Sequence, residues 1–129
     1  MNDPGTIVRD YLLSQGSLTT LVSERVYAEC DYPPVTYRIA QGPAICFKIR
    51  GGDIDPSEAL QRPSVQFKCY GRTEQEANTL YRTLHSMLHG KKSESIRWAY
   101  LEVLGQTLSE PETDWPFVLV FYRMFITNA

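Results

Sequence analysis

The sequence predicts an α+β fold: a largely antiparallel sheet of about four to five strands with two helices packed on one face. Two segments space their apolar residues as amphipathic helices do, and several others alternate apolar and polar residues as half-buried strands do. The order helix, strands, helix, strands favours helices layered on one side of a sheet. The chain of 129 residues, 43% hydrophobic and 22% charged, has the size and composition of one globular domain. We therefore expect a single domain over residues 1–129.

The first helix is predicted at the N-terminus. Asp3 can cap it, and Pro4 suits its first turn because proline lacks an amide hydrogen there. Gly16 is predicted to end the helix, and residues 18–22 indicate one further helical turn. The residues at helical spacing are Ile7, Val8, Tyr11 and Leu12.

The second helix has the strongest signals. Thr73 and Glu76 form a capping box, in which each side chain bonds the other residue's exposed backbone amide. Gly90 stands where a helix ends in a left-handed conformation. The helix must lie on a flat apolar partner, because one stripe is apolar throughout: Ala77, Leu80, Tyr81, Leu84, Met87 and Leu88.

The flat partner is predicted to be a sheet. Residues 44–50, 64–70 and 99–103 alternate, and residues 25–30 indicate a short fifth strand. Residues 117–126 are apolar on both faces apart from one arginine, so this strand is covered on both sides, within the domain or by another subunit. The residues expected on the inner face are Ile45, Phe47, Ile49, Val65, Phe67, Cys69, Ala99, Leu101 and Val103, with Gln66, Lys68, Trp98 and Tyr100 pointing outward.

Three segments are predicted to be loops: residues 31–42, 51–63 and 105–116. Loops longer than about 12 residues in a compact domain are often functional. The pair Gly51 and Gly52 follows a strand, but no helix begins there to hold a phosphate, so we interpret the glycines as a turn.

No motif in the sequence predicts catalysis, a metal or another cofactor. The three cysteines, at positions 30, 46 and 69, form no close pair, which favours buried free thiols over a disulfide framework or a zinc site. His85 and His89 have a spacing that can share a metal, but no third ligand is indicated, and we expect surface histidines. The acidic group at positions 110, 112 and 114 could serve acid–base chemistry or bind a divalent ion, but a solvated loop is favoured.

Composition narrows the possible partners. The net charge of −2 and a pI near 5.7 lack the basic footprint of a dedicated nucleic-acid binder. We expect no signal peptide and no membrane segment, since the longest apolar stretch, residues 117–122, is far too short to span a bilayer. Aromatic residues are numerous, and they favour a partner surface over a core edged by hydroxyl groups: Tyr27, Tyr32, Tyr37, Tyr70, Tyr100, Tyr122, Trp98 and Trp115.

The layout resembles the tail-terminator, or tail-completion, family of long-tailed bacteriophages, which includes the lambda-type terminator. After the first helix, residues 21–27 read Leu-Val-Ser-Glu-Arg-Val-Tyr, similar to the family's entry into the first strand. A proline-led strand at residues 62–71 and the capped helix from residue 73 to residue 90 follow. The chain then closes with a strand at residues 122–126, in which an arginine precedes an alternating apolar end. The resemblance covers nearly the whole chain.

The resemblance implies a structural protein rather than an enzyme. Family members form a ring, usually a hexamer, on the head-proximal end of the tail tube, where they stop tube polymerisation and provide the head-docking surface. The implied partners are further copies of the chain, the tail tube protein and a head-completion or connector protein, with DNA passing through the lumen without specific binding and no membrane. The implied location is the neck-proximal end of the virion tail, after assembly in the host cytoplasm.

We expect the subunit and tube interfaces in three places. These are the loop at residues 51–61, the loop at residues 108–115, and the second face of the last strand. The candidate interface residues are Asp53, Ile54, Asp55, Glu110, Glu112, Asp114, Trp115, Tyr122 and Met124.

Other functions stay open at this stage. The chain could be another neck or head–tail joining component, or a small α+β ligand-binding or enzymatic domain. An enzyme requires a concave pocket with convergent polar groups and perturbed titrating residues, whereas a ring protein requires a large complementary interface. A regulatory nucleic-acid binder is disfavoured by the charge.

Overall fold

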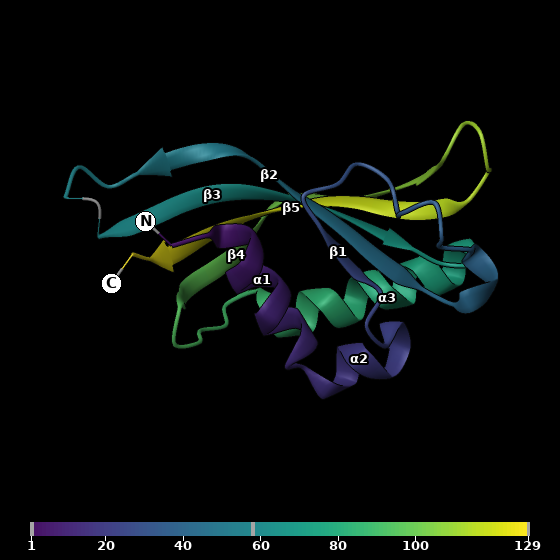
Figure 1. Ribbon diagram of the computed structural model, residues 1–129, viewed down its shortest axis with the longest axis horizontal. Coiled ribbons are helices and arrows are strands. Elements are labelled where there is room, and N and C mark those ends of the chain that lie inside the picture. The colour runs from purple at the N-terminus through teal and green to yellow at the C-terminus, as the bar shows by residue number, and fades with distance from the viewer. Residues whose placement is uncertain (1, 58, 129) are drawn as a thin grey trace.

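The computed structural model describes residues 2–57 and 59–128 and shows one five-stranded sheet with three helices beneath it (Figure 1). The strand order is β1-β2-β3-β5-β4, with β1 parallel to β2 and every other neighbouring pair antiparallel. The α+β prediction and the largely antiparallel sheet are confirmed. The strands are β1 (Val26–Ala28), β2 (Ala44–Ile54), β3 (Leu60–Tyr70), β4 (Ile96–Ser109) and β5 (Pro116–Thr127).

The N-terminal segment forms α1 (Pro4–Leu13) and α2 (Gly16–Val22). As predicted, the Asp3 carboxylate caps α1 by accepting the Gly5 N–H at 3.1 Å. The prediction that Gly16 ends the helix is wrong: the chain becomes extended at Gln15, and Gly16 begins α2. The further turn is thus a separate helix of seven residues.

The helix with the strongest sequence signals, α3 (Glu74–Leu88), packs on the sheet as predicted. The Thr73 hydroxyl accepts the Glu76 N–H at 3.1 Å, but the Glu76 carboxylate accepts the backbone N–H of Arg72, at 2.8 Å. The predicted capping box is therefore half formed, because the adjacent Arg72 guanidinium draws the carboxylate one residue further back. Gly90 has the expected positive φ, 72°.

Two of the three predicted loops are at least half strand. β2 and β3 continue as a hairpin through residues 51–54 and 60–63, and β4 extends to Ser109. Gly51 and Gly52, with φ of 81° and 126°, produce a bulge within β2 rather than its end, shown by the register shift between Ile49 and Gly52. Residues 31–42 are a loop as predicted, apart from a short 3-10 turn, η1 (Ile39–Gln41).

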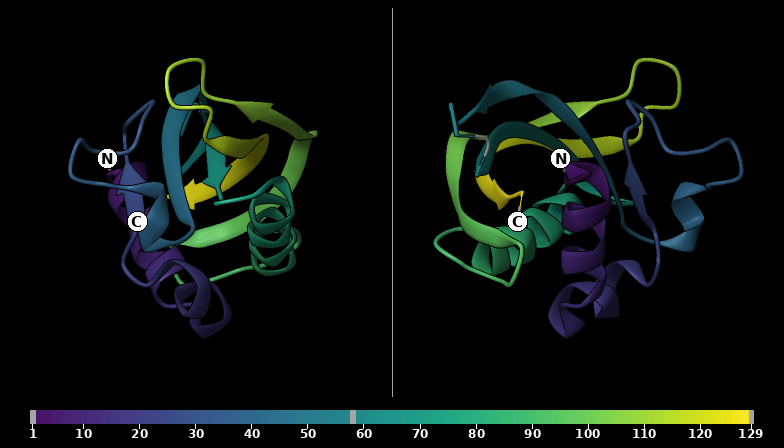
Figure 2. Two further views of the ribbon diagram at one scale, coloured as in Figure 1. Left: turned by 90° about the vertical axis from the view of Figure 1, so that its right-hand side faces the viewer. Right: turned by 60° about the vertical axis from the view of Figure 1, so that its left-hand side comes forward.

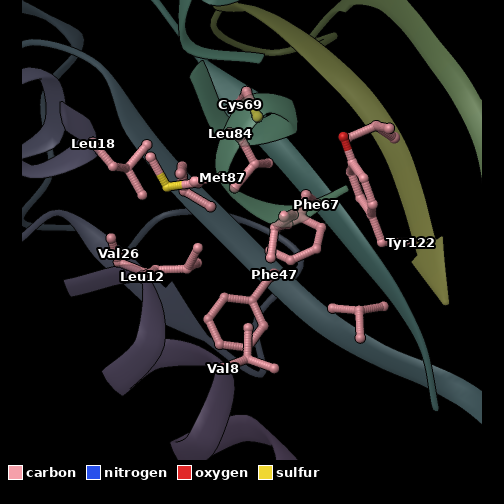
Figure 3. Packing of buried hydrophobic residues seen from close by; sticks show 14 of the residues in the cluster. Val8, Leu12, Leu18, Val26, Phe47, Phe67, Cys69, Leu84, Met87 and Tyr122 are labelled. Atoms are coloured by element: carbon pink, nitrogen blue, oxygen red, sulfur yellow. The ribbon is translucent and has the colours of Figure 1, made fainter. Parts of the chain in front are cut away.

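The main core lies between the helices and the concave face of the curled sheet (Figure 2). The predicted inner faces of β2 and β3 are confirmed, and the rings of Phe47 and Phe67 lie 5.7 Å apart at the centre. Figure 3 shows side chains from all three helices converging on these strands: Val8, Leu12, Leu18, Leu84 and Met87. The inward prediction fails for Val103, which is 51% exposed, because register shifts around Leu101 and Val103 break the alternation of β4.

A second, smaller cluster covers part of the outer face of the sheet. Cys46, Tyr70 and Phe117 are buried there, beneath residues of the 31–42 loop and Trp115. The first half of β5, which the sequence predicted to be covered on both faces, is thus covered within the chain itself. Gln66, predicted to point outward, does so but is buried on this covered face.

Candidate interaction surfaces

Two of the predicted interface residues lie in the core. Tyr122 and Met124 are fully buried, because β5 turns residues 118, 120, 122, 124 and 126 toward the helices. The Tyr122 hydroxyl is hydrogen-bonded to His85 Nδ1 at 2.7 Å, and its ring is edge-on to Phe67 at 5.8 Å. Burial raises the pKa of Tyr122. These two residues are therefore core residues and do not form part of the protein's surface.

The β2–β3 hairpin carries the next three candidates at one end of the molecule's long axis (Figure 1). We call residues 51–57 and 59–61 the hairpin arm. Asp53 and Ile54 are exposed, and the Asp53 carboxylate accepts the Arg62 Nε–H at 2.6 Å. The Asp55 carboxylate accepts the Ser57 hydroxyl, and this hydrogen bond lowers the pKa of Asp55. The structure brings these three candidates together on one projecting element.

The acidic turn at residues 110–115 lies at the opposite end (Figure 1). Glu112 and Asp114 are exposed, but Glu110 is buried, which corrects the solvated loop expected from the sequence. The Glu110 carboxylate accepts the Tyr70 hydroxyl at 2.6 Å and Lys68 Nζ–H at 3.3 Å, and these partners compensate its burial. Burial, together with the bond to Glu110, raises the pKa of Tyr70.

A groove of about 440 Å³ separates the acidic turn from the loop at residues 32–38. Its walls are mainly aromatic and proline side chains, and the Trp115 ring stands edge-on to Tyr37 at 5.4 Å. The sequence indicated Trp115 as an interface residue but not the opposing loop. The signal for that loop was Pro33-Pro34 flanked by two tyrosines, although pairing it with the acidic turn requires the folded chain.

The free side of β4 is a surface that the sequence did not predict. Within the described residues β4 pairs with β5 alone, so its other side is an edge of the sheet. Val103 and Leu104 are 51% and 73% exposed on this strand, and Trp98 and Tyr100 are also exposed. We call these four residues the β4 patch. Leu104-Gly105, which breaks the alternation, was the one local signal that this strand does not bury a regular inner face.

The two histidines are stacked neighbours at the end of α3. Their rings stack at 4.9 Å, and His89 Nδ1 accepts the Leu101 N–H at 3.0 Å. Burial, and secondarily His89, lower the pKa of His85. Nowhere in residues 2–57 and 59–128 do three His, Cys, Asp or Glu side chains gather in a group that could hold a metal ion.

The cysteines are free thiols, as the sequence indicated. Cys46 and Cys69 are buried and Cys30 is partly buried. Burial raises the pKa of Cys69, whereas a hydrogen bond from Cys46 lowers the pKa of Cys30.

No protein-family model and no curated protein matches the sequence. None of the helices in the described part of the chain combines the length and apolar character of a membrane span.

Proposed function

We propose that the protein is a phage tail terminator, which forms a ring on the head-proximal end of the tail tube, stops tube growth and offers a docking surface to the head. The observation that carries the proposal is the β4 patch on a free sheet edge. The family resemblance of the sequence layout supports it.

The β4 edge has the properties of a surface that another chain covers. An edge strand presents backbone N–H and C=O groups on its free side, and proteins usually protect them. On β4 three of these groups are bonded within the chain: the Ala99 carbonyl accepts the Gly90 N–H, and the Leu101 and Gly105 N–H groups donate to His89 Nδ1 and to the Tyr81 hydroxyl. The strand nevertheless exposes two adjacent apolar side chains, Val103 and Leu104. Apolar surface grouped in this way favours association.

The opposite side of the sheet supplies a second edge. β1 pairs with β2 only at Ile45–Phe47, so the outer half of β2 has a strand neighbour on one side alone, β3, among the described residues. The antiparallel pairs place β4 antiparallel to β2. If the β4 patch of one copy packs against the outer half of β2 in the next copy, the two strands run antiparallel across the subunit boundary.

Such a contact joins two different surfaces and is therefore heterologous, the type of contact that generates a ring when the rotation closes. The acidic turn, at the other end of the molecule from the hairpin arm, stays outside this contact and is available to the tail tube or to the head connector. Residues 51–54 of the hairpin arm belong to the outer half of β2 and take part in the contact, whereas its tip beyond Ile54 stays free for a further partner. A ring that matches the tube at one end but offers no tube-like surface at the other stops polymerisation by occlusion, without bond chemistry.

The test is light scattering coupled to size-exclusion chromatography over a wide concentration range, with and without tail tubes of the same phage. We expect a discrete species near six times the 14.8 kDa subunit mass, or a protein that binds tubes at one end. Leu104→Asp should abolish both, since it places a charge in the β4 patch. Gln75→Asp is the control with the same change in charge, because Gln75 is exposed on α3, away from β4, the hairpin arm and the acidic turn. A strict monomer that ignores tubes at every concentration overturns the proposal.

A further inference from the structure

The groove between residues 32–38 and the acidic turn has rigid aromatic walls. Tyr32 is 64% exposed at its rim, while Tyr37 is buried and anchored by a hydrogen bond from its hydroxyl to Gly42 O, at 2.6 Å. The edge-on contact with Tyr37 fixes the Trp115 ring, and Pro33 and Pro34 stiffen the facing loop. The groove is therefore preformed, and binding to it requires little ordering of its walls.

The groove also contains polar groups that the fold leaves unused. The hydrogen bonds of Glu110 all go to Oε1, and its Oε2 has no partner within the described residues. The Trp115 Nε1–H is likewise without an acceptor there. In the described part of the chain no side-chain nitrogen or oxygen is both fully buried and unbonded, so both groups reach solvent.

These groups match the chemistry of an extended, proline-containing peptide with a basic residue. Aromatic grooves bind the polyproline II conformation because its rings stack on aromatic faces and its backbone carbonyls remain free for donors such as an indole N–H. A buried carboxylate in an aromatic setting favours an arginine or lysine side chain through charge-assisted hydrogen bonds and cation–π contacts. Glu112 on the groove wall and Asp114 beside it add negative charge, while the guanidinium of Arg38, on the same wall, is hydrogen-bonded to the Val35 and Tyr37 carbonyls.

The chain itself shows that this corner holds a cation. Lys68 Nζ lies 4.9 Å from the ring centroids of both Tyr32 and Phe117, and 3.3 Å from Glu110 Oε1. This lysine bonds one oxygen of the carboxylate, Oε1. Glu110 lines the groove, and its other oxygen, Oε2, is the position for a second cation.

We propose that the groove is a docking site for an extended, proline-containing segment of a partner protein, with an arginine or lysine side chain bound between Trp115, Tyr32 and Glu110. Ring formation is not needed for this binding, so the site can be tested in any oligomeric state.

The test is fluorescence anisotropy with a labelled peptide that carries one arginine among prolines. The matched probe replaces the arginine with citrulline, which keeps the shape and removes the charge. We expect saturable binding of the arginine peptide and about tenfold weaker binding of the citrulline peptide, the size of one desolvated cation–π and carboxylate contact. Arginine amide alone, without the prolines, should bind far more weakly than the peptide.

Two variants place the binding in the groove. Tyr32→Ala should weaken the arginine peptide about tenfold without affecting the fold, because this side chain is mostly exposed. Glu110→Gln should remove the preference for arginine over citrulline. Gln75→Ala, at an exposed position on α3 outside the groove and the β4 patch, is the control and should bind as the native protein does. The proposal is overturned if neither peptide binds at millimolar concentration, if citrulline and arginine peptides bind equally, or if arginine amide binds as tightly as the peptide.

Discussion

Substitutions of Tyr122 test whether this residue belongs to the core or to an interface, and the structure predicts the size of the loss in stability. The side chain is fully buried, edge-on to Phe67 and hydrogen-bonded to His85 Nδ1. Tyr122→Phe keeps the ring and removes one hydrogen bond, so the free energy of unfolding should fall by about 1 kcal/mol. Tyr122→Ala removes the ring and leaves a cavity, so the loss should be about 3–5 kcal/mol.

Urea unfolding followed by circular dichroism measures both losses. The midpoint should shift while the slope with urea stays constant, because each substitution changes stability rather than the surface exposed on unfolding. Gln75→Ala at an exposed position on α3 is the control and should cost less than about 1 kcal/mol. The reasoning is refuted if Tyr122→Ala remains as stable as the native protein and loses only the ability to assemble, which is the result for a surface contact.

Three further measurements test the buried and strained positions. Burial lowers the pKa of His85 below its ordinary value near 6.5, so protonation of this side chain favours the unfolded chain. The contribution of His85 to the free energy of unfolding should therefore be constant above pH 6.5 and fall as the pH drops below it. His85→Gln should reduce this dependence on pH. Cys30 should react first with a thiol reagent, and Cys46 and Cys69 should react only when the chain unfolds. Cys30→Ser should remove the fast phase of the labelling reaction. Equal labelling rates for all three thiols would contradict the burial described. Gly52→Ala should cost about 1 kcal/mol or more, because Gly52 has φ of 126° and the facing strand leaves no room for a side chain, and an unchanged melting curve is the contrary result.

The local sequence patterns were sufficient to predict the layers of the fold. Alternation in residues 44–50 and 64–70 predicted the buried rings of Phe47 and Phe67, and the Thr73 cap began α3 at the expected place. The glycines were misleading, because Gly51 and Gly52 indicated a turn but form a bulge inside a strand. After a bulge the next residues continue to pair with the neighbouring strand, whereas after a turn they do not. Local sequence does not encode that pairing.

The candidate surfaces depended more on tertiary structure. Residues 117–126 are apolar on both faces apart from one arginine, so their pattern does not indicate that Tyr122 points inward. Glu110 belongs to an acidic, proline-containing segment typical of a solvated loop, and its burial depends on Lys68 and Tyr70, about 40 residues earlier in the chain. The exposed β4 patch exists because β5 lies inside β4 in the strand order, and no local pattern specifies that order.

Tail-tube length tests termination most directly. Purified protein, added in substoichiometric amounts to polymerising tube protein of the same phage, should give shorter tubes with a ring visible at one end by electron microscopy. In the presence of Leu104→Asp the tubes should be as long as those grown without any added protein, whereas Gln75→Asp should shorten them as the native protein does. Tubes that grow to their full length in the presence of native protein, with both ends bare, contradict the proposed function.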